Sequence, residues 1–143
     1  MKRILFPLLL VAALALVACS GSQAQSGPST IALKAEALKY NPATVEVTAG
    51  QPVTLMFQNA DSVEHDFSIM EIPVQMAATA EPMAGHDMGA MTANPQLHMA
   101  AAMGQTATMQ FTPTKPGTYE YFCTVPGHKE AGMKGTLIVK TPG

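Results

Sequence analysis

The sequence of 143 residues has no tryptophan, a single arginine at Arg3, and charged side chains at only 13% of its positions. Nucleic acid is therefore excluded as an expected partner, because phosphate backbones are bound by clustered lysine and arginine. Anionic substrates are disfavoured for the same reason. The length is too short for a multidomain enzyme, so one domain is expected.

Long hydrophobic runs are also scarce. The longest runs from Ile4 to Val17, about 14 residues, which is short of the roughly 20 that a membrane-spanning helix needs. It follows Lys2 and Arg3 and ends in Leu-Val-Ala before Cys19. This end resembles a bacterial lipoprotein signal, which is cleaved before a cysteine that then carries lipid. The alternative is an ordinary secretory signal in which Cys19 has no role.

Three segments are predicted: a signal peptide over 1–18, the lipidated Cys19 with a flexible tether over 19–30, and a folded domain over 31–143. The tether is composed of small and polar residues with nothing to pack. We expect an exported monomer, anchored by lipid on the outer face of the cell membrane or in the periplasm or outer membrane. Without the signal, six basic residues face ten acidic ones.

The domain shows a period of two in its apolar residues, which predicts half-buried strands. Turn-forming Asn, Asp, Gly and Pro separate these runs. The alternating sets are Val45 and Val47; Val53, Leu55 and Phe57; His65, Phe67 and Ile69; Ala107, Met109 and Phe111; Tyr119, Tyr121 and Cys123; and Leu137 and Val139. Seven to eight short strands at this spacing predict an all-β, antiparallel β-sandwich or barrel.

Residues 71–104 depart from this pattern. They contain many alanines, three prolines and six methionines: Met76, Met83, Met88, Met91, Met99 and Met103. We expect a long inserted loop, and loops of this length inside compact domains are usually functional or disordered. Only 97–103 have the spacing for a short helical turn or two.

The chemistry-bearing residues cluster late in the chain. With lipid on Cys19, Cys123 has no partner for an internal disulfide. Cys123, His128 and Met133 follow at five-residue intervals in a loop between two apolar strands. Thiolate, imidazole and thioether together suit copper in both oxidation states. His65, at the start of a predicted strand, supplies a second imidazole. Two His, one Cys and a distant axial Met form the blue-copper arrangement.

On these residues the chain resembles the cupredoxin family of small blue-copper proteins, from about Ile31 to Val139. The Cys-x4-His-x4-Met loop and the Thr-Tyr-x-Tyr-x-Cys approach are more similar to the auracyanin and rustacyanin branch than to plastocyanins. The resemblance implies a Greek-key β-sandwich holding one copper ion and passing single electrons, and not an enzyme. Carried over residue by residue, it assigns the equatorial ligands and the axial ligand to His65, Cys123, His128 and Met133.

The resemblance also implies a contact beside the copper ligands. In the family, the residue after the first ligand His is commonly Asn, and it bonds a hydroxyl residue just after the Cys. Here the pair is Asp66 and Thr124. An aspartate adds negative charge, which favours Cu(II), so a lower reduction potential than with Asn is expected. The strand alternation leaves open that Asp66 instead faces solvent, because it lies opposite His65.

Two functions remain open. As an electron carrier, the protein would exchange electrons with redox partners through a small apolar patch around His128, beside Val125 and Pro126. As a copper-trafficking protein, it would capture Cu(I) with thioethers and imidazoles of the inserted loop. The residues concerned are Met83, His86, Met88, Met91, His98, Met99 and Met103. These methionines would otherwise serve as an adaptable apolar lid or an oxidation sink.

Other site chemistries fit less well. Cys123 and His128 offer a thiol and a base, but no third group orients the imidazole for nucleophilic catalysis. Zinc prefers a closed tetrahedral ligand set, and the thioether of Met133 is a poor zinc ligand. A dinuclear copper centre would need a second cysteine in the loop.

Overall fold

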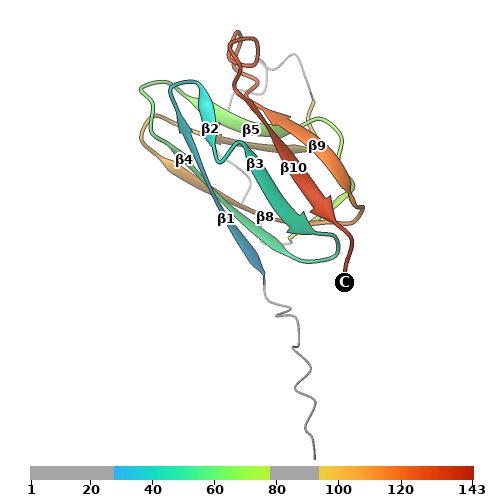
Figure 1. The fold of residues 1–143 in the computed structure, drawn as a ribbon. Helices are drawn as coiled ribbons and strands as arrows, with labels where there is room; N and C mark the ends of the chain where they lie inside the picture. Colours follow the sequence, from blue (N-terminus) through green and yellow to red (C-terminus); the bar gives the residue numbers. More distant parts are fainter. Residues whose placement is uncertain (1–27, 78–93) are drawn as a thin grey trace, which may run out of the picture.

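The computed structural model describes residues 28–77 and 94–143, which form ten strands and no helix. Two five-stranded sheets pack face to face, so the predicted all-β sandwich is confirmed (Figure 1). The first sheet, in spatial order, contains β2 (Lys39–Asn41), β1 (Ser29–Glu36), β4 (Val53–Asn59), β8 (Thr106–Pro113) and β6 (Val74–Met76). The second contains β3 (Thr44–Thr48), β10 (Lys134–Lys140), β9 (Gly117–Phe122), β5 (His65–Ile69) and β7 (Leu97–Ala101). Across both described ranges, no helix is long and apolar enough to cross a membrane.

Strand number and direction differ from the sequence-based expectation. Ten strands replace the expected seven to eight, because β2 and β6 have only three residues each. The sheets are also not purely antiparallel, since β1 pairs with β4, and β10 with β3, in parallel. Parallel neighbours need a crossover connection, and here β2 and β3 at the sheet edges supply it between β1 and β4.

The stretch 71–104 is not one continuous loop. It contains β6, which pairs with β8, and β7, which pairs with β5 along its whole length. The expected helical turn at 97–103 is wrong, because 97–101 are extended strand residues. β7 therefore lies next to the strand that carries His65.

The core fills the space between the sheets with alternate side chains from β1, β3, β4, β8 and β10, as the period of two predicted, whereas β5 is buried along its whole length. The core contains an aromatic cluster of Tyr40, Phe57, Phe67 and Tyr121. The Tyr121 ring centroid is 4.9 Å from that of Phe67 and 5.0 Å from that of Tyr40. Gly135, opposite Tyr121 on β10, has no room for a side chain, because a Cβ there would lie 2.2 Å from the Tyr121 ring.

Candidate metal centre

Three segments converge at the end of the sandwich opposite the C-terminus (Figure 1). His65 opens β5, Cys123 directly follows β9, and His128 lies in the loop that rises between β9 and β10. Ser68 on β5 lies beside Phe122 on β9, so the two strands bring His65 and Cys123 to the same end. The candidate site therefore depends on pairing between strands that are more than 50 residues apart.

The donor atoms of these three residues face one another. The Nδ1 atoms of His65 and His128 are 3.2 Å apart, and the Cys123 Sγ lies 3.4 Å from the His128 Nδ1 and 3.9 Å from the His65 Nδ1. Nitrogen and thiolate donors lie about 2.0–2.3 Å from a bound metal ion, so donors around one ion are about 3.3–3.9 Å apart. The group His65, Cys123 and His128 thus fits a metal ion.

The three donor residues differ in how deeply they are buried. His65 is fully buried and Cys123 is 1% exposed, whereas His128 is only partly buried. Burial raises the pKa of the Cys123 thiol to about 11, and burial and then the neighbouring His65 lower the pKa of His128. Near neutral pH the free thiol is therefore protonated and His128 is neutral, so metal binding must displace the thiol proton.

The loop from Cys123 to Met133 is closed by its own backbone. The Cys123 N–H donates to the Met133 carbonyl at 3.2 Å, and the Met133 N–H donates to the His128 carbonyl at 2.9 Å. Gly127 and Gly132 have positive φ angles of 85° and 100°, a conformation that favours glycine. Met133 is fully buried, and its carbonyl accepts from the Cys123 N–H.

Asp66 and Thr124, the pair implied by the family resemblance, lie in contact. The Asp66 carboxylate accepts hydrogen bonds from the Thr124 N–H at 3.0 Å and the Thr124 hydroxyl at 2.7 Å. The Ser68 hydroxyl donates to it at 2.8 Å. Asp66 is only 3% exposed, so it does not face solvent. Its Oδ2 is 3.8 Å from the Cys123 Sγ, which places a carboxylate beside the candidate ligand.

Sequence reasoning missed two groups at this site. Asp61 contacts the buried His65 ring, with its Oδ2 2.9 Å from the His65 Nε2. Tyr40 donates a short hydrogen bond from its hydroxyl to the Asp66 carbonyl. Asp61 appeared in the sequence only as part of a turn, and one sequence gives no signal that this turn folds back onto the histidine.

Only part of the methionine-rich segment lies within the described residues. Met83, His86, Met88 and Met91 fall outside the described residues, as does the lipidation candidate Cys19. The other three take different positions: His98 and Met99 lie on β7, and Met103 lies after it, 61% exposed. Met99 is fully buried in the core, and the His98 Nδ1 lies 2.8 Å from the Ser68 hydroxyl.

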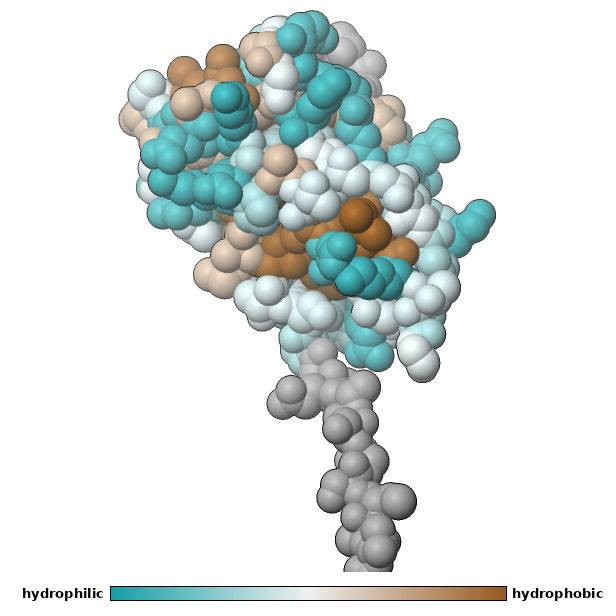
Figure 2. All heavy atoms as spheres, viewed as in Figure 1, coloured by the Kyte–Doolittle hydropathy of each residue, from teal (hydrophilic) through white to brown (hydrophobic). Residues whose placement is uncertain are grey.

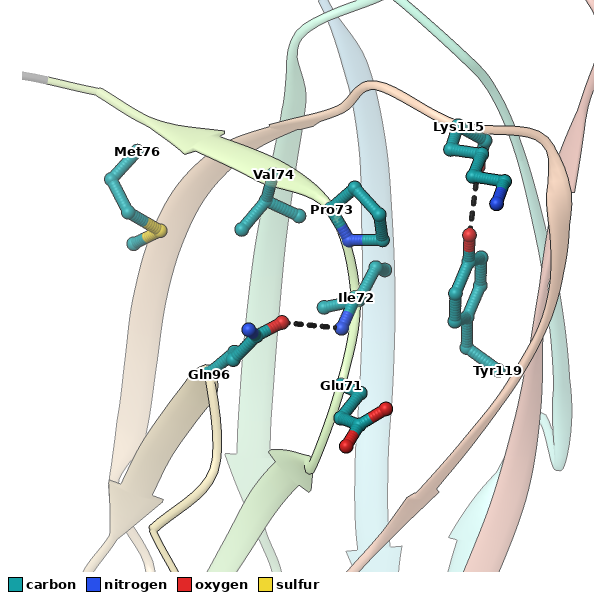
Figure 3. A pocket seen from close by; sticks show the side chains of 8 residues that line it. All are labelled: Glu71, Ile72, Pro73, Val74, Met76, Gln96, Lys115 and Tyr119. Atoms are coloured by element: carbon teal, nitrogen blue, oxygen red, sulfur yellow. Dashed lines mark hydrogen bonds between the residues drawn. The ribbon is translucent and has the colours of Figure 1, made fainter.

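A groove lies at the end of β5 and β9 that is opposite to His65 and Cys123. It is an open groove of about 820 Å³, lined by Glu71, by apolar side chains of the β5–β6 connection and of β6, and by Gln96, Lys115 and Tyr119 (Figure 3). Tyr119 lines this groove, and the extended chain from Tyr119 to the candidate ligand Cys123 spans roughly 13 Å at 3.3 Å per residue, so the groove is separate from the donors. The groove holds no His or Cys, so it does not contribute to the metal site.

Comparison with known proteins agrees with this geometry. The family model for the Cupredoxin-like domain matches residues 8–139. Auracyanin-A from Chloroflexus aurantiacus is 31% identical, with 97% of each chain covered. The copper-resistant cuproprotein CopI from Rubrivivax gelatinosus is 31% identical, over 84% of this chain and 71% of CopI. A solved structure of auracyanin A, titled a "blue" copper protein, superposes with a TM-score of 0.59 and 30% identity, covering 80% and 100% of the chains.

The fold and the convergent donors together define a small metal-binding β-sandwich protein. The chain belongs to the cupredoxin-like family. Copper is accordingly the metal that the group of His65, Cys123 and His128 is suited to hold, and the soft thiolate with two imidazoles agrees with that choice.

Proposed function

We propose that the protein is a blue-copper electron carrier, in which His65, Cys123 and His128 are the equatorial ligands and Met133 is the weak axial ligand. A copper ion in this set would cycle between Cu(I) and Cu(II), carrying one electron. The observation that supports the proposal is the convergence of two Nδ1 atoms and one Sγ within 3.9 Å of one another.

The residues around the donors favour electron exchange over substrate chemistry. The His65 ring is fixed by Asp61, the segment after Cys123 is tied to Asp66, and the loop carrying His128 is closed by backbone hydrogen bonds. Donors that are held in place need little rearrangement when the charge of the centre changes. His65 and Cys123 are also buried, which limits the access of a substrate to the metal position from their side.

Electron exchange is proposed to pass through His128, because it is the least buried of the three donors. Its loop contains Pro126, which is exposed, and Val63 at the same end of the sandwich is 49% exposed. Figure 2 shows hydrophobic residues reaching the surface at this end, among polar ones. A small, partly apolar contact of this kind suits redox partners that must separate quickly.

A copper titration of the metal-free protein tests the electron-carrier proposal. One equivalent of copper should produce an intense blue thiolate band, and the reduced and oxidised forms should interconvert with a soluble redox partner or mediator. Cys123→Ser should abolish the band. Met56→Leu, at an exposed methionine of β4 outside every candidate copper site, should leave both band and stoichiometry unchanged. Copper binding without a thiolate band would contradict the proposal.

Copper trafficking is the second candidate, supported by the similarity to a copper-resistant cuproprotein. It requires Cu(I) to bind beyond the blue site. The test is the Cu(I) stoichiometry of the wild-type chain and of a variant with Met83, Met88 and Met91 changed to Leu. Extra equivalents that disappear in the variant would favour trafficking. A stoichiometry of one in both proteins would exclude it.

We further propose export and lipid attachment at Cys19, so that the carrier stays near membrane-bound redox partners. Several acyl chains, as in a mature lipoprotein, would give firm attachment where a single chain would not. Mass spectrometry of the mature chain should show a lipidated N-terminal cysteine. Release of Cys19→Ser into the soluble fraction would support the anchor, and equal membrane recovery of both proteins would contradict it.

A further inference from the structure

We propose that Asp61 is a positioning residue of the copper centre, whose carboxylate fixes the His65 ring and lowers the reduction potential. The inference rests on the proposed function, in which His65 binds copper through Nδ1. It concerns a residue four positions before the ligand, on the β4–β5 loop.

The first argument is the orientation of the ring. The Asp61 Oδ2 is 2.9 Å from the His65 Nε2, while the His65 Nδ1 faces Cys123 and His128. A carboxylate only accepts hydrogen bonds, so in the neutral ring the proton sits on Nε2. The Nδ1 lone pair is then directed toward the metal position. Partners of this kind fix the tautomer of a ligating histidine and increase its basicity.

The second argument is that Asp61 is itself held on both sides. Its carboxylate accepts from the Ala37 N–H at 2.9 Å and the Leu38 N–H at 3.4 Å. Its own N–H donates to the Asn59 side chain at 2.9 Å. The carboxylate is thus fixed between the β1–β2 turn and the histidine, and cannot rotate away without breaking these contacts.

The β1–β2 turn has a geometry that matches this role. Ala37 and Leu38 are non-glycine residues with φ angles of 52° and 57°, a left-handed conformation that L-residues rarely adopt. This conformation presents both N–H groups to one carboxylate. Asp61 therefore connects the β1–β2 turn, which is distant in sequence, to the fully buried ring of His65.

The charge of Asp61 gives the expected direction of the redox effect. A negative group on a ligand favours the more highly charged Cu(II) over Cu(I). Because the Asp61 side chain is 22% exposed, solvent screens part of this effect. Removing the charge should therefore weaken Cu(II) binding more than Cu(I) binding.

Two variants separate charge from position. Asp61→Asn removes the charge and keeps one oxygen that accepts from Nε2, while its NH2 group replaces the oxygen that accepts from the Ala37 N–H, so Cu(II) affinity should fall about tenfold relative to Cu(I). That raises the potential by about 59 mV for a one-electron couple. Asp61→Ala also removes the acceptor, so copper affinity should fall about 10- to 100-fold.

The control is Glu130→Gln, which removes the same charge from an exposed position in the His128 loop. It should shift the potential much less than Asp61→Asn. An equal shift in the control would overturn the proposal, since a general charge effect would explain both. Unchanged potential and affinity in both Asp61 variants, with only a lower melting temperature, would reduce Asp61 to an anchor of the turn.

A metal-free measurement keeps the inference separate from the proposed function. Nitrogen NMR of the metal-free chain should show the Nε2-protonated tautomer of His65 in the wild type and a mixture in Asp61→Ala. An identical tautomer in both proteins would overturn the positioning role. Failure of the wild-type chain to form a blue centre would instead refute the proposed function, whatever the tautomer.

Discussion

Asp66→Asn should raise the reduction potential of the copper centre, because it removes a buried negative charge beside the thiolate ligand. The Asp66 Oδ2 lies 3.8 Å from the Cys123 Sγ. At an effective dielectric constant of about 20, two unit charges at that separation interact by about 4 kcal/mol. The change in charge is shared between metal and sulfur, and hydrogen bonds from Thr124 and Ser68 disperse the carboxylate charge.

About 1.5–2 kcal/mol is therefore expected to reach the redox couple, at most half of the full interaction. This corresponds to a rise of about 65–90 mV for one electron. Asn has nearly the shape of Asp, and the Thr124 and Ser68 hydroxyls can accept from its amide as readily as they donate to the carboxylate. The site should thus keep its structure, so that the shift reports charge.

Voltammetry of the wild type and Asp66→Asn at one pH and ionic strength measures the shift. Thr124→Val is the matched control with the opposite sign, because it removes a hydroxyl that donates to the carboxylate at 2.7 Å. It leaves the charge less dispersed and should lower the potential. An unchanged or lowered potential in Asp66→Asn would refute the reasoning.

Three further predictions concern binding and stability. Because the Cys123 pKa is raised to about 11, copper must displace one thiol proton, so copper affinity measured by competition should rise about tenfold per pH unit between pH 8 and 10. Gly135→Ala places a Cβ within 2.2 Å of the Tyr121 ring and should lower the free energy of unfolding by about 1–3 kcal/mol in urea titrations. Tyr40→Phe removes the buried hydrogen bond to the Asp66 carbonyl and should cost about 1–3 kcal/mol in the same assay.

Each of the three has a control. In Cys123→Ser the steep pH dependence of copper affinity should disappear, and its persistence would contradict the thiol assignment. Gly117→Ala meets only a 3.1 Å contact with the Tyr119 hydroxyl and should be milder than Gly135→Ala. Tyr119→Phe removes an exposed hydrogen bond to the Lys115 carbonyl, so a loss equal to that of Tyr40→Phe would argue against the buried bond.

Local patterns in the sequence anticipated much of the fold. Strands β4, β8 and β10 have one face in the core and one toward solvent. The alternation of their residues therefore predicts that the side chains of Phe57 and Leu137 point into the core. β5 is buried on both faces, so alternation alone left open whether Asp66 faces the site or solvent. β7 has the same problem: four of its five residues are buried, which hides the strand in a run of Leu, Met and Ala.

The sequence could not predict which distant segments contact each other in the fold. The spacing of Cys123, His128 and Met133 is visible because one loop carries all three. The contact of Asp61 with His65 depends on the β1–β2 turn, whose backbone amides reach across more than 20 residues of sequence. The parallel pairing of β1 with β4 is likewise set by the whole topology and not by the residues of either strand.

The most direct test of the account is a copper titration of the metal-free protein that follows visible absorption and bound metal together, in the wild type and in Cys123→Ser. The account predicts one equivalent of copper with an intense blue thiolate band in the wild type, and no such band in the variant. A wild-type chain that binds copper without the band, or a variant that keeps it, would contradict the assignment of Cys123 and the blue-copper centre.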